Sequence, residues 1–151
     1  MNTSQLFKVR KAGIADLDFI HHAIVAINEV DIAKHEFELL LKAKLKTAGC
    51  FIFILEEHTR SATKAGLLVA RSYQNLTDYW PIIEIQELYI IPKYRKLGGA
   101  DFLYNYVEGF SREQKAYRLK VNCNINSTLN QNFYTTRGFK ISKKQYAKDV
   151  Y

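Results

Sequence analysis

A strand-loop-helix unit in the middle of the chain limits the possible fold more than any other feature. The apolar, β-rich run 82–91 lies between Pro81 and Pro92, as expected for a buried strand. A basic loop follows, and Gly98 and Gly99 precede a segment, 101–114, in which apolar residues recur at helical spacing. Such a loop can direct backbone N–H groups at one point, and the positive end of the helix dipole adds attraction for a phosphate. The alternative is a tight turn that binds nothing.

Hydrophobic periodicity predicts further strands and helices on both sides of this unit. Helical spacing marks two segments near the N-terminus, and a polar stretch separates two β-rich runs that would form an antiparallel hairpin. Gly138 is expected to end the last helix in the left-handed conformation. The order β α α β β β α β α β is typical of an α/β fold. The predicted strands are 6–10, 50–55, 65–73, 82–91, 118–123 and 139–142, and the predicted helices are 16–27, 36–46, 101–114 and 127–136.

Composition indicates one compact domain over residues 1–151. Hydrophobic residues make up 48% of the chain, with only 2 prolines and 7 glycines, which excludes disordered and collagen-like classes. Cys50 and Cys123 form no CxxC pair, so we expect no disulfide scaffold or zinc site, and a reducing cytoplasm fits best. No apolar run reaches the ~18 residues of a membrane span. His21 and His22 point about 100° apart on a helix and cannot chelate a metal together, so no metal is expected.

The chain is basic, with a formal net charge of +7, and this charge lies in its second half. Residues 93–151 contain 12 Lys and Arg against 4 Asp and Glu, whereas residues 1–92 contain 10 against 11. A nucleic acid, an acidic membrane surface or a phosphorylated small molecule would each suit such a charge. Because no helix-turn-helix, RNP, KH or zinc pattern occurs, a nucleic-acid-binding module is the remote alternative.

Two motifs together point to a known family. Arg95-x-x-Gly98-x-Ala100 follows the central strand, and Phe133-Tyr134-x-x-x-Gly138-Phe139 lies near the C-terminus. In this order they resemble the GNAT superfamily of N-acetyltransferases, which use acetyl-coenzyme A (acetyl-CoA). The resemblance implies a GNAT fold, with a central mixed, mostly antiparallel twisted sheet flanked by about four helices. Within the superfamily, Glu84-Ile-Gln-Glu87-Leu and Asn124 look most like the aminoalkylphosphonate N-acetyltransferases.

The resemblance also implies where acetyl-CoA binds. Leu88, Tyr89 and Ile90 occupy the family position where the central strand bulges and splays, so that backbone groups pair with pantetheine and one amide bonds the thioester oxygen. The loop after that strand would hold the pyrophosphate through main-chain amides, and which asparagine contacts the coenzyme stays open. The implied coenzyme-binding residues are Leu88, Tyr89, Ile90, Arg95, Lys96, Leu97, Gly98, Gly99, Ala100, Asp101, Asn124 and Asn126.

Amide formation requires the acceptor amine to lose a proton, although an alkyl ammonium has a pKa near 10. Glu84 and Glu87 on the central strand are the candidate bases. They are three residues apart, so a regular strand points them to opposite faces, which a bulge between them would change. The family resemblance makes Tyr134 the proton donor to the departing thiolate, and the alternative is a tyrosine that only packs in the core.

The expected activity is transfer of acetyl from acetyl-CoA to a primary amine of a small molecule by direct attack. An aminoalkylphosphonate, a polyamine or an amino sugar would serve as acceptor, and Tyr73, Tyr79 and Trp80 fall where acceptors bind in the family. The alternatives are acetylation of a protein N-terminus or lysine, and coenzyme binding without catalysis. A homodimer is the family expectation.

Overall fold

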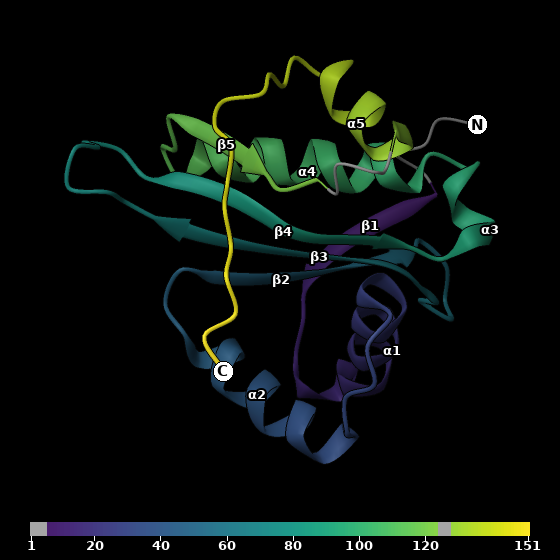
Figure 1. Ribbon diagram of the computed structural model, residues 1–151. Coiled ribbons are helices and arrows are strands. Elements are labelled where there is room, and N and C mark those ends of the chain that lie inside the picture. Colours follow the sequence, from purple (N-terminus) through teal and green to yellow (C-terminus); the bar gives the residue numbers. More distant parts are fainter. Residues whose placement is uncertain (1–5, 124–127) are drawn as a thin grey trace. The chain divides into compact units, whose positions relative to one another are not determined.

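The computed structural model describes residues 6–123 and 128–151, and five strands form one sheet in the order β1-β2-β3-β4-β5 (Figure 1). Neighbouring strands pair antiparallel except β4 and β5, which are parallel. The mixed, mostly antiparallel sheet expected from the family resemblance is therefore confirmed. The strands are β1 (Phe7–Lys11), β2 (Cys50–Glu57), β3 (Lys64–Tyr73), β4 (Ile82–Ile90) and β5 (Arg118–Val121).

Helices cover both faces of this sheet (Figure 1). On one face, Ile20 and Leu41 from two helices pack on Ile54 and Leu67 of β2 and β3. On the other, Phe53 of β2 meets aromatic rings of a third helix at centroid distances of 5.1 Å. The alternation of side chains along each strand thus supplies two apolar layers. The helices are α1 (Leu17–Asn28), α2 (Lys34–Lys46), α3 (Pro92–Arg95), α4 (Gly99–Glu113) and α5 (Thr128–Thr135), with a 3-10 turn at Ile14–Asp16.

Most predicted elements are confirmed within a few residues at their ends, and two differ. The loop after β4 contains the one-turn helix α3, which begins at a proline and was not predicted. The strand predicted at 139–142 is wrong, because these residues form no regular structure and Ile141 is 95% exposed. A strand needs a neighbour for its backbone hydrogen bonds, and no described strand pairs with this segment. None of the described helices has the length and apolarity needed to cross a bilayer.

Contacts divide the chain into two compact units, one ending at Val121 and one beginning at Asn122. The second unit contains α5, in which the Tyr134 ring packs between Phe133 and Phe139 at centroid distances of 5.1 and 5.3 Å. Gly138 has φ +85° and donates its N–H to Thr135 O at 3.1 Å, so the predicted glycine termination is confirmed.

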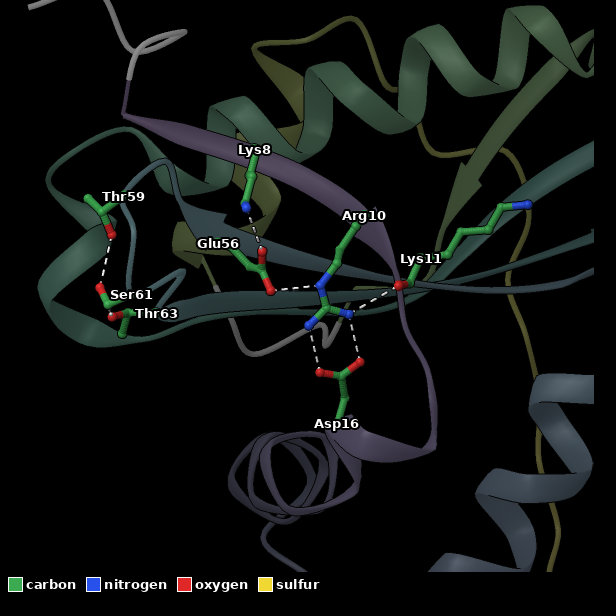
Figure 2. A network of polar contacts seen from close by, with 8 residues as sticks. All are labelled: Lys8, Arg10, Lys11, Asp16, Glu56, Thr59, Ser61 and Thr63. Carbon is green, nitrogen blue, oxygen red and sulfur yellow. Dashed lines mark hydrogen bonds and ion pairs between the residues drawn. The ribbon is translucent and has the colours of Figure 1, made fainter.

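A polar network fixes the start of α1 against the first unit's sheet. Figure 2 shows the Arg10 guanidinium between Glu56 of β2 and Asp16, which directly precedes α1. Arg10 Nη1 and Nη2 donate to the two Asp16 oxygens at 2.8 and 2.7 Å, and its Nε donates to Glu56 Oε1 at 2.6 Å. Lys64 pairs with Asp16 at 3.1 Å and Lys8 with Glu56 at 3.3 Å. The network therefore connects β1, β2 and β3 with the 3-10 turn that precedes α1.

Candidate active site

A β-bulge in β4 brings the two candidate bases to one face of the sheet. Val69 of β3 lies opposite Glu87 and the next residue, Ala70, lies opposite Ile85, so Gln86 is the extra residue. Arg71 lies opposite Glu84. Since Val69 and Arg71 are two residues apart, their partners Glu87 and Glu84 share a face, the one covered by α1. The bulge considered in the sequence analysis is therefore present between the two glutamates.

This bulge lies before the position that the family resemblance implied. Leu88, Tyr89 and Ile90 pair in regular register with Leu68, Leu67 and Gly66 of β3. On the opposite side of β4, β5 pairs only as far as Val121 opposite Ile85. Within residues 6–123 and 128–151, the segment of β4 from Gln86 onward has no strand partner on that side. Alternate backbone groups of this segment therefore face an edge without a paired strand in the described part of the chain, and the splay that the resemblance implies stays a prediction.

Glu84 is held in an ion pair. Its carboxylate accepts two donors of Arg71, Nε and Nη2, each at 2.6 Å from Oε2. The Glu84 side chain is 7% exposed, whereas that of Arg71 is 51% exposed. Both Arg71 donors bind the same oxygen of Glu84, which makes that oxygen less available to a substrate.

Glu87 lies in a different environment. It is half-buried, and burial raises the pKa of its carboxyl group above the ordinary value. The side-chain amide of Asn28, the last residue of α1, donates to Glu87 Oε1 at 3.4 Å and partly opposes this rise. A carboxylate with a raised pKa accepts a proton more readily. Of the two glutamates, Glu87 therefore has the environment of a general base.

The loop after β4 combines exposed cations with two glycines that have separate structural roles. Arg95, Lys96 and Leu97 are exposed. Gly98 directly precedes α4 with φ +80°, a left-handed conformation that favours glycine. A Cβ on Gly99 would lie 3.0 Å from Tyr94 O and 3.2 Å from Ile90 Cγ2, so the first turn of α4 packs tightly on the end of β4.

This donor set fits a pyrophosphate. The first N–H groups of a helix have no partner within the helix, and α4 is 15 residues long. Ala100 is half-buried and Asp101 is exposed in that first turn. One donor of the loop is used structurally, since Arg95 Nε bonds Ile90 O at 2.9 Å. The remaining contribution of Arg95 and Lys96 is positive charge.

Other candidate residues lie elsewhere in the chain. Tyr134 belongs to the second unit and is 7% exposed. Asn124 and Asn126 fall outside the described residues. Cys123 was expected in a strand, but β5 ends at Val121, and burial raises the pKa of the Cys123 thiol. A thiol with a raised pKa is a poor nucleophile at neutral pH.

The structure adds two cations that sequence reasoning did not single out, both close to an expected acceptor-site tyrosine. Arg71 lies 4.8 Å from the centroid of the Tyr73 ring, and Lys120 Nζ donates to the Tyr73 hydroxyl at 3.1 Å. Lys120 lies directly opposite Glu84 in the β4–β5 register. No local sequence pattern connects these residues, because strand register alone brings them together.

Two further aromatic residues lie in the β3–β4 loop. Tyr79 is 83% exposed and contacts Trp80 at a ring-centroid distance of 4.9 Å. Trp80 lines an open surface hollow of about 440 Å³ with Arg112, Lys115, Ala116 and Tyr117. Tyr79 and Trp80 are therefore exposed in the loop, whereas Tyr73 lies at the end of β3.

The histidines of α1 are used in packing. His21 Nε2 is hydrogen-bonded to Ile32 O at 2.7 Å, and its ring meets Phe37 at 5.1 Å. The His22 ring contacts Tyr89 at 6.4 Å. In the described part of the chain, no three His, Cys, Asp or Glu side chains are grouped as a metal site would require.

Three solved structures with the same fold are distant from this chain in sequence. A possible acetyltransferase from Clostridium difficile 630 has a TM-score of 0.83 at 14% identity, covering 97% of this chain and 99% of its own. An aminoglycoside N-acetyltransferase in complex with CoA has a TM-score of 0.79 at 14% identity, covering 95% and 93%. An aminoglycoside antibiotic 6'-N-acetyltransferase from Acinetobacter baumannii has a TM-score of 0.76 at 14% identity, covering 95% and 99%.

A search of curated proteins found no sequence that matches the chain. The profile of the acetyltransferase (GNAT) family matches residues 17–139, which include most of the sheet, the loop before α4 and the Phe133-Tyr134 motif. This match covers well over half of the chain. The protein therefore belongs to the acetyltransferase (GNAT) family, whose members use acetyl-CoA.

Proposed function

We propose that the protein transfers the acetyl group of acetyl-CoA to the primary amine of a small molecule, with Glu87 as the general base. The observation that carries this proposal is the bulge at Gln86, which sets Glu87 and Glu84 on one face while, among the described residues, Arg71 pairs with Glu84 and not with Glu87. Glu87 combines partial burial, a raised pKa and a single long hydrogen bond from Asn28. These properties support proton removal from an ammonium group.

Acetyl-CoA supplies an activated acyl group, as a thioester whose thiolate can leave. The unpaired edge of β4 at Leu88, Tyr89 and Ile90 would bind the pantetheine arm and donate one amide to the thioester oxygen. Gly98, Gly99, Ala100 and Asp101 would hold the pyrophosphate through main-chain N–H groups, with Leu97 before them in the loop. Arg95 and Lys96 would add positive charge, and Asn124 or Asn126 is the proposed additional coenzyme contact.

Glu87 would take one proton from the acceptor ammonium, directly or through water, so that the nitrogen can attack. Glu84 would stay bonded to Arg71 and keep that side chain in place. The Tyr134 hydroxyl would donate a proton or a hydrogen bond to the departing thiolate. Glu87 and Tyr134 would each perform one proton step. The second proton that the nitrogen loses after attack would restore the Tyr134 hydroxyl through solvent, and no covalent intermediate on the protein is required.

The proposed acceptor is a small molecule such as an aminoalkylphosphonate, a polyamine or an amino sugar. The motif resemblance around Glu84 and Glu87 supports the first of these. Two of the similar structures are aminoglycoside N-acetyltransferases, which supports a small-molecule amine in general. The alternative function is acetylation of a protein N-terminus or lysine, and the test below distinguishes the two.

The test is thiol release from acetyl-CoA across a panel of aminophosphonates, polyamines, amino sugars and lysine-containing peptides. For the best acceptor, Glu87→Gln should lower kcat by about 10²–10⁴-fold, the range of general-base catalysis. Glu113→Gln removes an exposed carboxylate at the end of α4 and serves as the charge-matched control. Turnover of peptides alone would refute the small-molecule acceptor, and an unchanged kcat in folded Glu87→Gln would refute the assigned base.

A further inference from the structure

Three charged residues form a row across the sheet beside the proposed base. Arg71 on β3 lies opposite Glu84 on β4, and Glu84 lies opposite Lys120 on β5. Residues directly opposite one another on neighbouring strands project from the same face. The row therefore consists of a cation, an anion and a second cation. Glu87, three residues after Glu84, is the next residue of β4 on the same face because of the bulge.

Lys120 is the cation of this row that has no carboxylate partner. Its ammonium group donates to the neutral Tyr73 hydroxyl at 3.1 Å and lies 5.6 Å from the centroid of the Tyr73 ring. Among the described residues, no Asp or Glu oxygen lies within ion-pair distance of Lys120 Nζ. Residues 1–5 and 124–127 contain no Asp or Glu in their sequence. The positive charge of Lys120 is therefore left for an anion from outside the chain.

The nearest acidic group of the neighbouring loop is already engaged. Asp78 accepts a hydrogen bond from the Tyr117 hydroxyl at 2.8 Å and another from the Asn75 side chain at 2.6 Å. Lys120 affects Asp78 only through a weak charge interaction, the last of the causes that lower the pKa of Asp78. Asp78 thus has its own partners and does not pair with Lys120.

Arg71 can assist Lys120 because Glu84 occupies only part of its guanidinium. A guanidinium has five N–H donors in a planar fork. Two of its nitrogens, Nε and Nη2, bond Glu84 Oε2, and the side chain remains 51% exposed. The Tyr73 ring lies against both cations, at 4.8 Å from Arg71 Cζ and 5.6 Å from Lys120 Nζ. Both positive groups therefore contact the same tyrosine.

We propose that Lys120, assisted by Arg71, binds an anionic group of the acceptor, so that the substrate class is an amine that also carries a phosphonate, phosphate or carboxylate. This inference rests on the proposed function and deepens it. Glu87 and Glu84 lie opposite β3 residues that are two apart, about 7 Å along the strand. Lys120 lies on the neighbouring strand opposite Glu84, so a short amino acid or aminophosphonate would place its ammonium at Glu87 and its anion toward Lys120.

The experiment compares acceptors of similar length: 2-aminoethylphosphonate, β-alanine, ethanolamine and 1,3-diaminopropane. We expect the wild type to favour the two anionic amines over the neutral and cationic ones in kcat/KM by about 10-fold or more, since a hydrogen bond between charged groups has that strength. Lys120→Gln should reduce kcat/KM for the anionic amines about 10- to 100-fold and leave ethanolamine within about 3-fold. Lys120→Arg, which keeps the charge, should retain most of the preference.

Two controls separate this inference from the proposed function. Lys11→Gln makes the same charge change on β1, at the opposite edge of the sheet, and should leave every acceptor unaffected. Binding of ethylphosphonate, which has an anion but no amine, is measured by calorimetry and should weaken about 10-fold in Lys120→Gln. Equal losses for ethanolamine and aminoethylphosphonate, or better turnover of the diamine, would overturn the inference. Phosphonate binding that depends on Lys120 without turnover of any amine would instead refute the proposed function.

Discussion

Replacing Arg10 with methionine removes the guanidinium of the network in Figure 2 and keeps most of the aliphatic side chain. The two carboxylates that it joins are nearly inaccessible, with Asp16 2% and Glu56 4% exposed. The variant loses three charge-assisted contacts of 2.6 to 2.8 Å. Two buried anions would then keep their charge with fewer partners, so the folded state should be destabilised.

The size of the destabilisation depends on the contacts that Asp16 and Glu56 keep in the variant. Removing one partner of a buried ion pair costs about 3–5 kcal/mol. Asp16 would keep Lys64 at 3.1 Å and the Gly13 N–H at 2.9 Å, and Glu56 would keep Lys8 at 3.3 Å. We therefore expect the lower end, about 3 kcal/mol, which lowers the melting temperature of a chain of this size by roughly 6–12 °C.

The effect should depend on pH with a definite sign. The hydrogen bonds from Arg10 are the main cause that lowers the pKa of Asp16 well below its usual range. An unfolded Asp has a pKa of about 3.9. The stabilisation from Asp16 is therefore fully present above about pH 5 and is lost as pH falls toward the folded value. The difference between wild type and Arg10→Met should be largest at pH 7 and shrink at pH 3.

Urea unfolding at pH 7 and pH 3 measures these free energies, provided that the m-values agree. Arg10→Lys keeps the charge without the planar fork and should lose only about 1 kcal/mol. In an Asp16→Asn background, Arg10→Met should have a smaller effect, because the paired carboxylate is absent. A loss that is the same at both pH values and in both backgrounds would refute the ionic explanation and leave packing as its cause.

Three further predictions concern the site. Asn28→Ala removes the amide that lowers the pKa of Glu87, so the acid limb of the kcat profile should move to higher pH; an unmoved limb would mean that another group titrates. Tyr134→Phe should lower kcat about 10-fold or more while the calorimetric acetyl-CoA affinity stays within about 2-fold, and full turnover would remove the hydroxyl's role. Gly98→Ala, at φ +80°, should lose about 1–2 kcal/mol in thermal unfolding, and an unchanged melting temperature would argue against strain there.

Elements with strong local periodicity could be predicted from the sequence alone. The helix α4 and the hairpin of β2 and β3 have apolar patterns that repeat several times, and their type does not depend on distant residues. The four-residue helix α3 is too short to show a period. The false strand at 139–142 has β-forming residues, but local propensity cannot say whether a neighbouring strand is available.

The candidate site was predictable in its residue types but not in its geometry. Glu84 and Glu87 could be selected because they lie on the central strand, yet their shared face depends on one extra residue, Gln86, that alternation does not reveal. Arg71 gives the two glutamates different environments, because it pairs with Glu84. That pairing depends on the register between β3 and β4, which includes the bulge itself, so it could only be read from the fold.

Two of the basic groups in the second half of the chain flank the proposed base in the first unit. Arg95 and Lys96 lie in the loop beyond the end of β4, and Lys120 lies on β5 opposite Glu84. The stretch of β4 between them carries Glu87, which would repel a continuous polyanion running from one group to the other. Two small anions, a pyrophosphate at the loop and an acceptor anion at Lys120, avoid this repulsion. These two basic groups therefore suit the proposed pair of ligands, a coenzyme and an acidic amine.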